Sequence, residues 1–342
     1  MDEILQERLH QLSDLDLAVL VSHTAALHCL VWSESHVLND LRRELQVTCQ
    51  ETFGLQTAVV NCSPTSTVDE LSEAILVNYD DSLEDASEQR ESEGKSTLSV
   101  NRLSSRGHSP GRFGSNANIL DDRRIADVII TNDLDLAPAN VQVQILELLR
   151  TKRIFTRTAM HTAPKDLLLI AVASKPGARL MHHLNDMFGM SHYHGDEDSL
   201  PHVEGKVERF ALPSFSREEL TSLRSRAEAV RLTGEIDAYL HDIVVFMRQS
   251  RYVKGGITAT ATRDLRAVAK ALAPLHGLDF VPPSLVALAA RKVYPHRMIM
   301  ATAQTERTLQ WGSDPDAVRE MLTGLTTEDV IEDVLGSVDV PL

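Results

Sequence analysis

Four histidines close together are the residues in this sequence best suited to metal chemistry. With the acids that follow them, they are His182, His183, His192, His194, Asp196, Glu197 and Asp198. Imidazole and carboxylate groups hold Zn²⁺ when their spacing lets several of them converge on one ion. The spacings here match no zinc motif, and paired histidines in a polar loop are commonly solvated. We therefore predict no metal site.

Phosphate chemistry would need a glycine-rich turn between a strand and a helix, ending in Gly-Lys-Ser or Gly-Lys-Thr. The backbone N–H groups and the lysine of such a turn hold nucleotide phosphates, and its hydroxyl binds Mg²⁺. Gly94-Lys95-Ser96 has the last three letters of this motif, but Gln89 stands where its first glycine belongs. No apolar strand leads into these residues. We interpret the match as a coincidence.

The charge balance limits the kinds of partner. The 342 residues include 34 Lys and Arg against 49 Asp and Glu, a formal net charge of −15. This field would repel a polyanion that is held mainly by its phosphates, so we expect no nucleic-acid partner. The length and the 43% share of hydrophobic residues are enough for about two domains with buried cores.

The cysteines, the lack of long apolar runs and the acidic N-terminal residues bear on where in the cell the protein is expected. Cys29, Cys49 and Cys62 are odd in number and form no Cys-x-x-Cys pair, which indicates a reducing environment. No apolar run approaches the roughly 18 residues that a membrane helix needs. Residues 1–8 carry acids where a signal or transit peptide would be basic. We expect a cytoplasmic protein, with the nucleus left open.

Apolar runs predict the strands that would position any site. They lie at residues 28–32, 57–62, 126–130 and 167–172. Helical spacing of apolar residues lies between them, for example over residues 139–150. Continuous apolar strands separated by helices indicate a parallel sheet that is covered on both faces.

The composition divides the chain into two domains and one insertion. Residues 1–213 form the predicted α/β domain, interrupted at residues 79–118 by an acidic and then Ser-rich segment. That segment has too few apolar residues to offset its ordering entropy, so we predict disorder there. Residues 214–342 show helical stripes and no strand run, which predicts a small helical domain.

Three segments resemble the AAA+ branch that holds the ATPase subunit of magnesium chelatase and the MoxR proteins. Residues 129–142 resemble its Walker B strand and following helix, and residues 167–173 its sensor-1 strand. Residues 256–261 resemble the lid helix that normally reads Gly-x-Ser-Pro-Arg-Ala. The resemblance implies an AAA+ fold: a P-loop-NTPase-like parallel α/β sheet domain with a C-terminal helical lid. It further implies an ATP and Mg²⁺ site and assembly into rings.

The same resemblance places the nucleotide site on positions whose chemistry has changed. The P-loop belongs after the strand at 28–32, where residues 33–38 contain neither glycine nor lysine. Asn132 stands where the family has an Asp that helps hold Mg²⁺. Asp133 stands at the position of the family's catalytic Glu, which orients the attacking water. Ser174 replaces the sensor-1 Asn.

Two arginines of the family pattern are also missing. Met187 stands at one of them, and Thr260 aligns with the sensor-2 Arg. Arg263, about one helical turn later, could substitute, although a solvated helix face explains it more simply. Phosphoryl transfer depends on positive charge around the γ-phosphate, so these losses remove most of its stabilisation.

The leading hypothesis is a pseudo-ATPase of the degenerate, fungal magnesium-chelatase-like type. It would act as a binding or assembly subunit with protein partners, in a homo- or hetero-oligomeric AAA+ assembly, without a confident cofactor. The alternative is an active ATPase of magnesium chelatase type, which would use ATP and Mg²⁺ at an atypical site for metal insertion or protein remodelling. A third possibility is a monomeric interaction protein that kept only the fold.

Overall fold

The computed structural model describes residues 2–78, 123–157, 159–174, 180–195, 197–205 and 215–341. The predicted insertion at 79–118 and the predicted domain boundary between 213 and 214 lie outside these residues. Within the described part, no helix is both long and apolar enough to cross a membrane.

A parallel sheet of five strands forms the core, in the order β2-β5-β8-β1-β9. The strands are β1 (His28–Ser33), β2 (Thr57–Asn61), β5 (Val128–Asn132), β8 (Leu168–Ser174) and β9 (Phe188–Tyr193). Each neighbouring pair is parallel, which confirms the α/β fold class. The four predicted apolar runs supply four of these strands.

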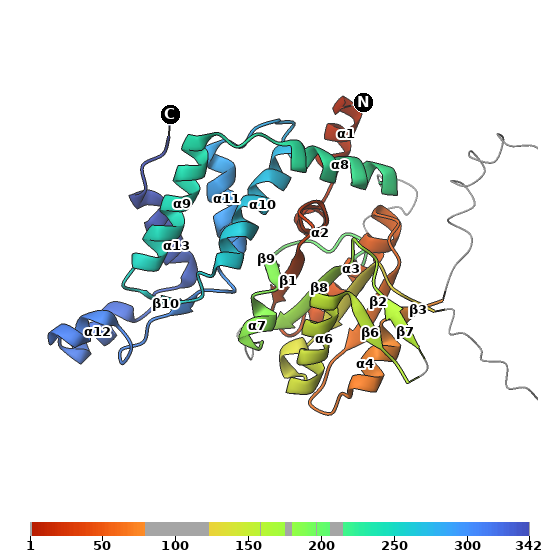
Figure 1. Ribbon diagram of the computed structural model, residues 1–342, viewed down its shortest axis with the longest axis horizontal. Helices are drawn as coiled ribbons and strands as arrows, with labels where there is room; N and C mark the ends of the chain where they lie inside the picture. The colour runs from red at the N-terminus through yellow and green to blue at the C-terminus, as the bar shows by residue number, and fades with distance from the viewer. Residues whose placement is uncertain are drawn as a thin grey trace, which may run out of the picture.

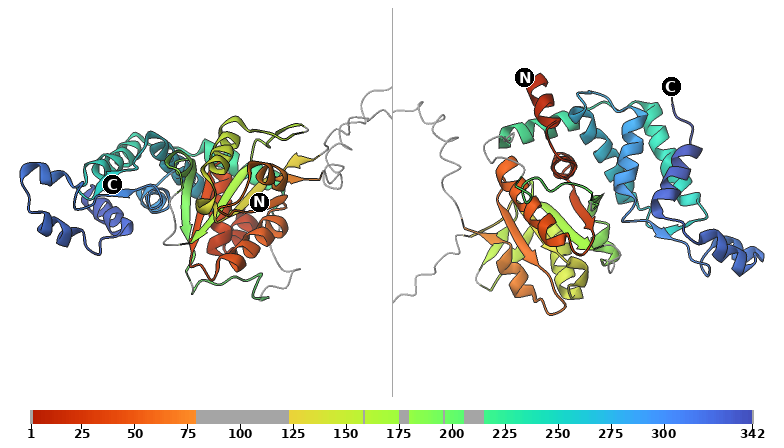
Figure 2. Two further views of the ribbon diagram at one scale, coloured as in Figure 1. Left: turned by 90° about the horizontal axis from the view of Figure 1, so that it is seen from below. Right: turned by 180° about the vertical axis from the view of Figure 1, so that it is seen from behind.

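Helices cover both faces of this sheet (Figures 1 and 2). Leu30 of β1 packs in one hydrophobic cluster with residues of α4 and α6, whereas Cys29 and Val31 pack in the other with α2 and α3. This alternation follows the two-residue period of a strand. The helices are α1 (Asp2–Leu9), α2 (Asp14–Thr24), α3 (Leu38–Val47), α4 (Val68–Ala74), α6 (Ala139–Thr151) and α7 (His182–Asn185).

Two short antiparallel pairs extend the core at its β2 side and after α6. They are β3 (Leu76–Val77) with β4 (Arg124–Ile125), and β6 (Arg153–Phe155) with β7 (Met160–Thr162). The first pair lies next to β2 and α4, at the end of the molecule far from the C-terminal helices (Figure 1).

The C-terminal part is a helical lid beside β9. Its helices are α8 (Arg217–Ala229), α9 (Gly234–Gln249), α10 (Ala259–Leu275), α11 (Pro283–Val293), η4 (Arg307–Trp311), α12 (Pro315–Leu322) and α13 (Thr327–Ser337). Both α10 and α11 contact β9 (Figure 1). The expectation of no strand here was wrong, since β10 (Val253–Gly255) and β11 (Ile299–Met300) form a small antiparallel pair. Strands this short leave no apolar run in the sequence.

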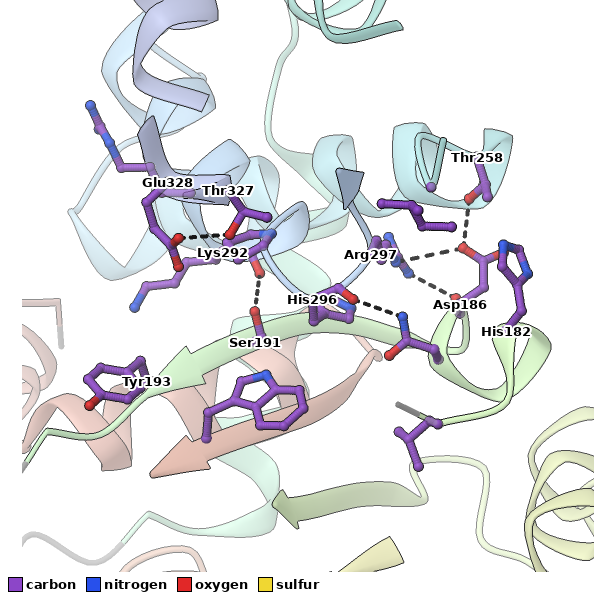
Figure 3. Close-up of a pocket in the computed structure, with 17 residues that line it drawn as sticks. His182, Asp186, Ser191, Tyr193, Thr258, Lys292, His296, Arg297, Thr327 and Glu328 are labelled. Atoms are coloured by element: carbon purple, nitrogen blue, oxygen red, sulfur yellow. Dashed lines mark hydrogen bonds and ion pairs between the residues drawn. The ribbon is translucent and has the colours of Figure 1, made fainter. Parts of the chain in front are cut away.

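One buried arginine joins the lid to the core. Arg297, 4% exposed, donates from Nη2 to a carboxylate oxygen of Asp264 on α10. The same nitrogen donates to the backbone carbonyl of Asp186, directly after α7, at 2.9 Å. Thr258, the N-cap of α10, donates from Oγ1 to Asp186 Oδ1 at 2.6 Å (Figure 3). Burial raises the pKa of Asp264 even with the guanidinium beside it. Desolvation therefore outweighs the attraction at that carboxyl.

Gly256 allows the close approach that this contact needs. Its φ is +94°, and a Cβ at this position would lie 1.9 Å from the carbonyl oxygen of Arg297. Only glycine accepts both conditions, because it has no Cβ and adopts positive φ at low cost. The first glycine of the lid-helix pattern is thus explained by backbone packing.

Several histidines are buried as neutral rings. His28 begins β1, is 7% exposed, and accepts the Leu169 N–H at Nδ1 over 3.2 Å. Burial and, to a smaller extent, the charge of Lys152 lower its pKa to about 3. Burial also lowers the pKa of His296 to about 3 and that of His23 to about 4. A protonated His28 ring could not accept the Leu169 N–H at Nδ1.

Arg297→Met should destabilise the protein more than Asp264→Asn. Methionine fills the same space but leaves the Asp264 carboxylate buried without its cation, which costs about 3–5 kcal/mol of unfolding free energy. Asparagine still accepts a hydrogen bond from Arg297, and the guanidinium keeps its second ion pair with Asp186, so we expect a smaller loss. Urea denaturation measures both. As a control, Arg319→Met removes an exposed ion pair with Asp316 and should cost well under 1 kcal/mol. An Arg297→Met variant as stable as the control would contradict this account.

Acid should destabilise the fold below pH 6.5, the ordinary pKa of histidine. Above that pH the folded and unfolded chains both hold neutral histidines, so the stability is fully present. Below it the histidines of the unfolded chain bind protons, whereas the buried rings of the folded chain do not. Each buried ring therefore lowers the free energy of unfolding by about 1.4 kcal/mol per pH unit. His28→Gln keeps an acceptor that does not titrate, so denaturation between pH 6 and 4.5 should show a slope shallower by about that amount. An unchanged slope would refute the assignment; the exposed His241→Gln is the control.

Candidate functional site

The carboxyl ends of three neighbouring strands bring three predicted site residues to one edge of the sheet. Ser33 of β1 pairs in register with Ser174 of β8, and Asn132 of β5 with Val172 of β8. Asp133 follows Asn132 and donates its N–H to the Val172 carbonyl at 3.0 Å. In parallel α/β sheets this is the edge where ligands bind. The structure therefore brings Asn132, Asp133 and Ser174 together at this edge.

The side chains at this edge lack the partners that phosphate chemistry would need. Asn132 is 7% exposed, and its Oδ1 has no hydrogen-bond partner. Asp133 has a φ of +52°, in the left-handed region that Asp tolerates better than most residues. Burial raises the pKa of Asp133. In the part of the chain that the structure describes, no cation forms an ion pair with it. The edge thus presents one carboxyl group without a counter-charge.

The connection after β1 has no phosphate cradle. Residues 34–37 join Ser33 directly to α3, and the Val37 N–H closes a tight turn on the Glu34 carbonyl at 3.1 Å. Val37 caps α3 without a side-chain hydrogen bond. A phosphate loop presents several inward N–H groups and a lysine, whereas this turn has no glycine or lysine and adds the exposed Glu34 carboxylate. The residues present do not fit Mg²⁺-ATP.

The structure does not bring Thr260 and Arg263 to that edge. Both lie on α10, where Arg263 Nη2 donates to Thr260 Oγ1 at 3.3 Å. Arg263 lines an open groove between α9 and α10 on the lid. The predicted substitute for the sensor-2 arginine therefore lies on a lid surface, away from Asp133.

A cavity of about 590 Å³ opens between the core and the lid (Figure 3). This volume lies in the range of small-molecule sites, and domain boundaries are common places for them. Sequence reasoning missed it because its walls come from β1, β9, α7, the two lid helices α11 and α13, and lid segments outside the helices. Among its lining residues are Trp32, His182, Asp186, Ser191, Tyr193, Gly256, Thr258, Arg291, Lys292, His296, Arg297, Thr327 and Glu328.

The cationic groups of this cavity are paired, mostly with residues just outside its lining. Arg291 forms a two-point ion pair with Glu332 of α13, and Arg297 is held by its carboxylate partners. Lys292 Nζ lies 3.3 Å from Nδ1 of His192. Burial and then the Lys292 charge lower the pKa of His192 to about 4, so the ring is neutral and accepts from the ammonium. The cavity has internal charge balance and no convergent set of catalytic groups.

The histidine cluster of the sequence is divided between two elements. His182 and His183 lie on α7 with their ring centroids 5.7 Å apart, whereas His192 lies on β9 and His194 directly after it. His194 Nδ1 lies 4.0 Å from a carboxylate oxygen of Asp198. Asp196 lies outside the described residues. Within the described ranges, no three His, Cys, Asp or Glu side chains are arranged to hold a metal ion.

Comparisons with known proteins agree with an α/β core followed by a helical lid. Residues 245–321 match the AAA lid domain. The chain is 16% identical to a crystallised candidate ATPase of Cytophaga hutchinsonii, with a TM-score of 0.63 over 95% of this chain and 88% of that one. At this identity the likeness shows the fold alone.

Two curated proteins match a shorter stretch. Maintenance of telomere capping protein 2 of Lachancea thermotolerans is 29% identical over 116 residues, which are 32% of this chain and 41% of that protein. The uncharacterized protein YeaC of Bacillus subtilis is 27% identical over 130 residues, 38% of this chain and 36% of that protein. The matches thus cover less than half of either relative. The five-stranded parallel sheet and the matching lid together give this chain the AAA+ fold, an α/β domain with a C-terminal helical lid.

Proposed function

We propose that this chain is a magnesium-chelatase/MoxR-like AAA+ protein that has lost ATP hydrolysis and acts as a binding or assembly subunit. The turn at residues 34–37 carries this proposal. It is too short and too acidic to surround a triphosphate, and its tight hydrogen bond leaves no row of N–H groups for an anion.

The charges around the remaining positions support the same conclusion. Asn132 offers no anionic Mg²⁺ ligand, and Asp133 has no cation beside it in the described part of the chain. Arg263 faces a groove on the lid surface. Phosphoryl transfer relies on positioned positive charge, and none of these residues supplies it at the sheet edge.

Exposed apolar side chains support a binding role. Phe155 and Met160 pair across the β6–β7 hairpin and are 63% and 49% exposed. Trp311, on the segment before α12, is 87% exposed. Neighbouring exposed apolar groups commonly mark protein interaction sites. We therefore propose protein partners in a homo- or hetero-oligomeric assembly, a cytoplasmic location with the nucleus open, and no nucleic-acid partner.

Isothermal titration calorimetry of the full-length chain with Mg²⁺ should show no heat of binding at millimolar ATP or ADP. The physical reason is that the turn after β1 lacks a phosphate-binding loop, and that the Glu34 carboxylate would repel the phosphates there. Micromolar binding that disappears in Asp133→Asn or Arg263→Gln would contradict the proposal. That result would favour the alternative, an active ATPase with an atypical site, and a turnover assay would follow.

A further inference from the structure

Exposed apolar side chains gather on one face of the β6–β7 hairpin. Phe155 is 63% exposed and Met160 is 49% exposed, and the two residues pair across the strands. Side chains alternate along a strand, so Arg153 and Thr162 share this outer face, whereas Ile154 between them is buried. We call Arg153, Phe155, Met160 and Thr162 the hairpin face.

A second exposed apolar group lies at the tip of an arm on the lid. The chain leaves β11, forms η4 and α12 and returns to α13, and α12 projects away from the other helices (Figures 1 and 2). Trp311, at the end of η4, is 87% exposed. We call residues 311–320 the arm tip. An indole ring offers one of the largest apolar surfaces of any side chain, so its position favours a partner surface.

Polar contacts fix the base of this arm. Arg251, on the turn after α9, pairs with Glu306 over 3.4 Å from Nε to Oε1. Arg307 donates from Nη2 to the backbone carbonyl of Arg248 at 3.2 Å. Val318 of α12 is buried. The tip is thus held in a defined place, which lowers the entropy that binding through it would cost.

The surroundings of the hairpin face are basic. Residues 150–162 contain three exposed arginines, Arg150, Arg153 and Arg157, and no acid. Within the described part of the chain, Arg157 pairs with Asp69, whereas Arg150 and Arg153 form no ion pair. The hairpin face therefore carries positive charge that an acidic partner would balance.

The arm tip is acidic. Asp314, Asp316 and Glu320 are all exposed, and the tip has one cation, Arg319. Arg319 pairs with Asp316, so Asp314 and Glu320 keep their charge without a cation in the ranges that the structure describes. Complementary charge of this kind selects a partner surface and its orientation.

We propose that the arm tip of one copy docks on the hairpin face of a second copy. Trp311 packs on Phe155 and Met160, and the carboxylates of the tip lie opposite Arg153. Aromatic pairs and sulfur–aromatic contacts both stabilise such an arrangement. Apolar match and opposite charge on the same two surfaces identify the occupant as this chain itself.

The two surfaces do not meet within one copy. The hairpin follows α6 on the core, whereas η4 and α12 extend the lid beyond β9, and the two lie at opposite ends of the molecule (Figures 1 and 2). The contact is therefore head-to-tail, and it builds a ring or a filament. This inference rests on the proposed assembly role and names its surface.

Sedimentation velocity of the full-length chain tests the apolar part of the contact. Trp311→Ser removes the anchor of the arm, and Phe155→Ser with Met160→Ser removes its apolar partner. Phe280→Ser is the matched control, since this ring is 44% exposed and belongs to neither surface. We expect the first two variants to weaken self-association about tenfold or more and the control to leave it unchanged.

Charge reversal tests the electrostatic part. Arg153→Glu places a carboxylate opposite the acidic tip and should weaken self-association about threefold or more, with the wild type also weakened by salt. Arg43→Glu makes the same change at an exposed position of α3 and should have no effect. Association of Arg153→Glu equal to that of the wild type would overturn the proposal.

Mixing two variants separates the halves of the contact. The Trp311→Ser chain keeps its hairpin face, and the Phe155→Ser, Met160→Ser chain keeps its arm tip. At a concentration where each alone is monomeric, the mixture should form a 1:1 heterodimer, which also shows that both chains are folded. The absence of a heterodimer would contradict the contact.

Two further outcomes would overturn the proposal in different ways. Undiminished association of the Trp311→Ser chain would remove this surface and leave the proposed assembly role intact. A monomeric wild type would remove self-assembly as well. Neither outcome would alter the nucleotide calorimetry, so a failure of this contact is distinguishable from a failure of the proposed loss of ATP hydrolysis.

Discussion

A buried guanidinium holds the two parts of this molecule together. Arg297 can be buried only because Asp264 of the lid and Asp186 of the core both approach it, and burial of an arginine without such partners would cost several kcal/mol. Gly256, just before α10, lets its own segment of backbone approach that of Arg297. The cavity between core and lid and the outward position of the α9–α10 groove follow from this fixed arrangement.

This chain has the fold of an AAA+ module, and we propose that it lacks the nucleotide chemistry. Asn132, Asp133 and Ser174 lie at neighbouring strand ends, at the edge of the sheet where parallel α/β proteins bind ligands. The turn after β1 spans residues 34–37 and contains no glycine or lysine. Packing of the apolar strands maintains the fold without any help from a nucleotide, because the two hydrophobic clusters cover both faces of the sheet.

The sequence predicted the parts of the structure that rest on local patterns. The runs at 28–32 and 167–172 became β1 and β8 because central parallel strands are apolar on both faces. β9 was missed, since its sequence Phe-Gly-Met-Ser-His-Tyr shows neither an apolar run nor alternation, although most of it is buried. It is held by β1 and by the lid, which are distant in sequence.

The candidate site likewise has parts that local sequence patterns locate and parts that depend on how distant elements pack. Strand ends can be aligned from sequence, and the structure brings Asn132, Asp133 and Ser174 to one edge of the sheet. The direction of Arg263 depends on how α10 rotates against α9, and no local pattern reports that rotation. The cavity at the lid joins residues more than a hundred positions apart, such as Ser191 and Lys292, whose contact spans 3.3 Å. Only the packed structure brings them together.

The central claim is that the turn after β1 no longer meets a nucleotide. Hydrogen–deuterium exchange of the full-length chain, with and without millimolar Mg²⁺-ATP, observes this turn directly. The account predicts identical exchange at residues 34–40 and at Asp133 in both conditions. Protection of these amides by the nucleotide would contradict it.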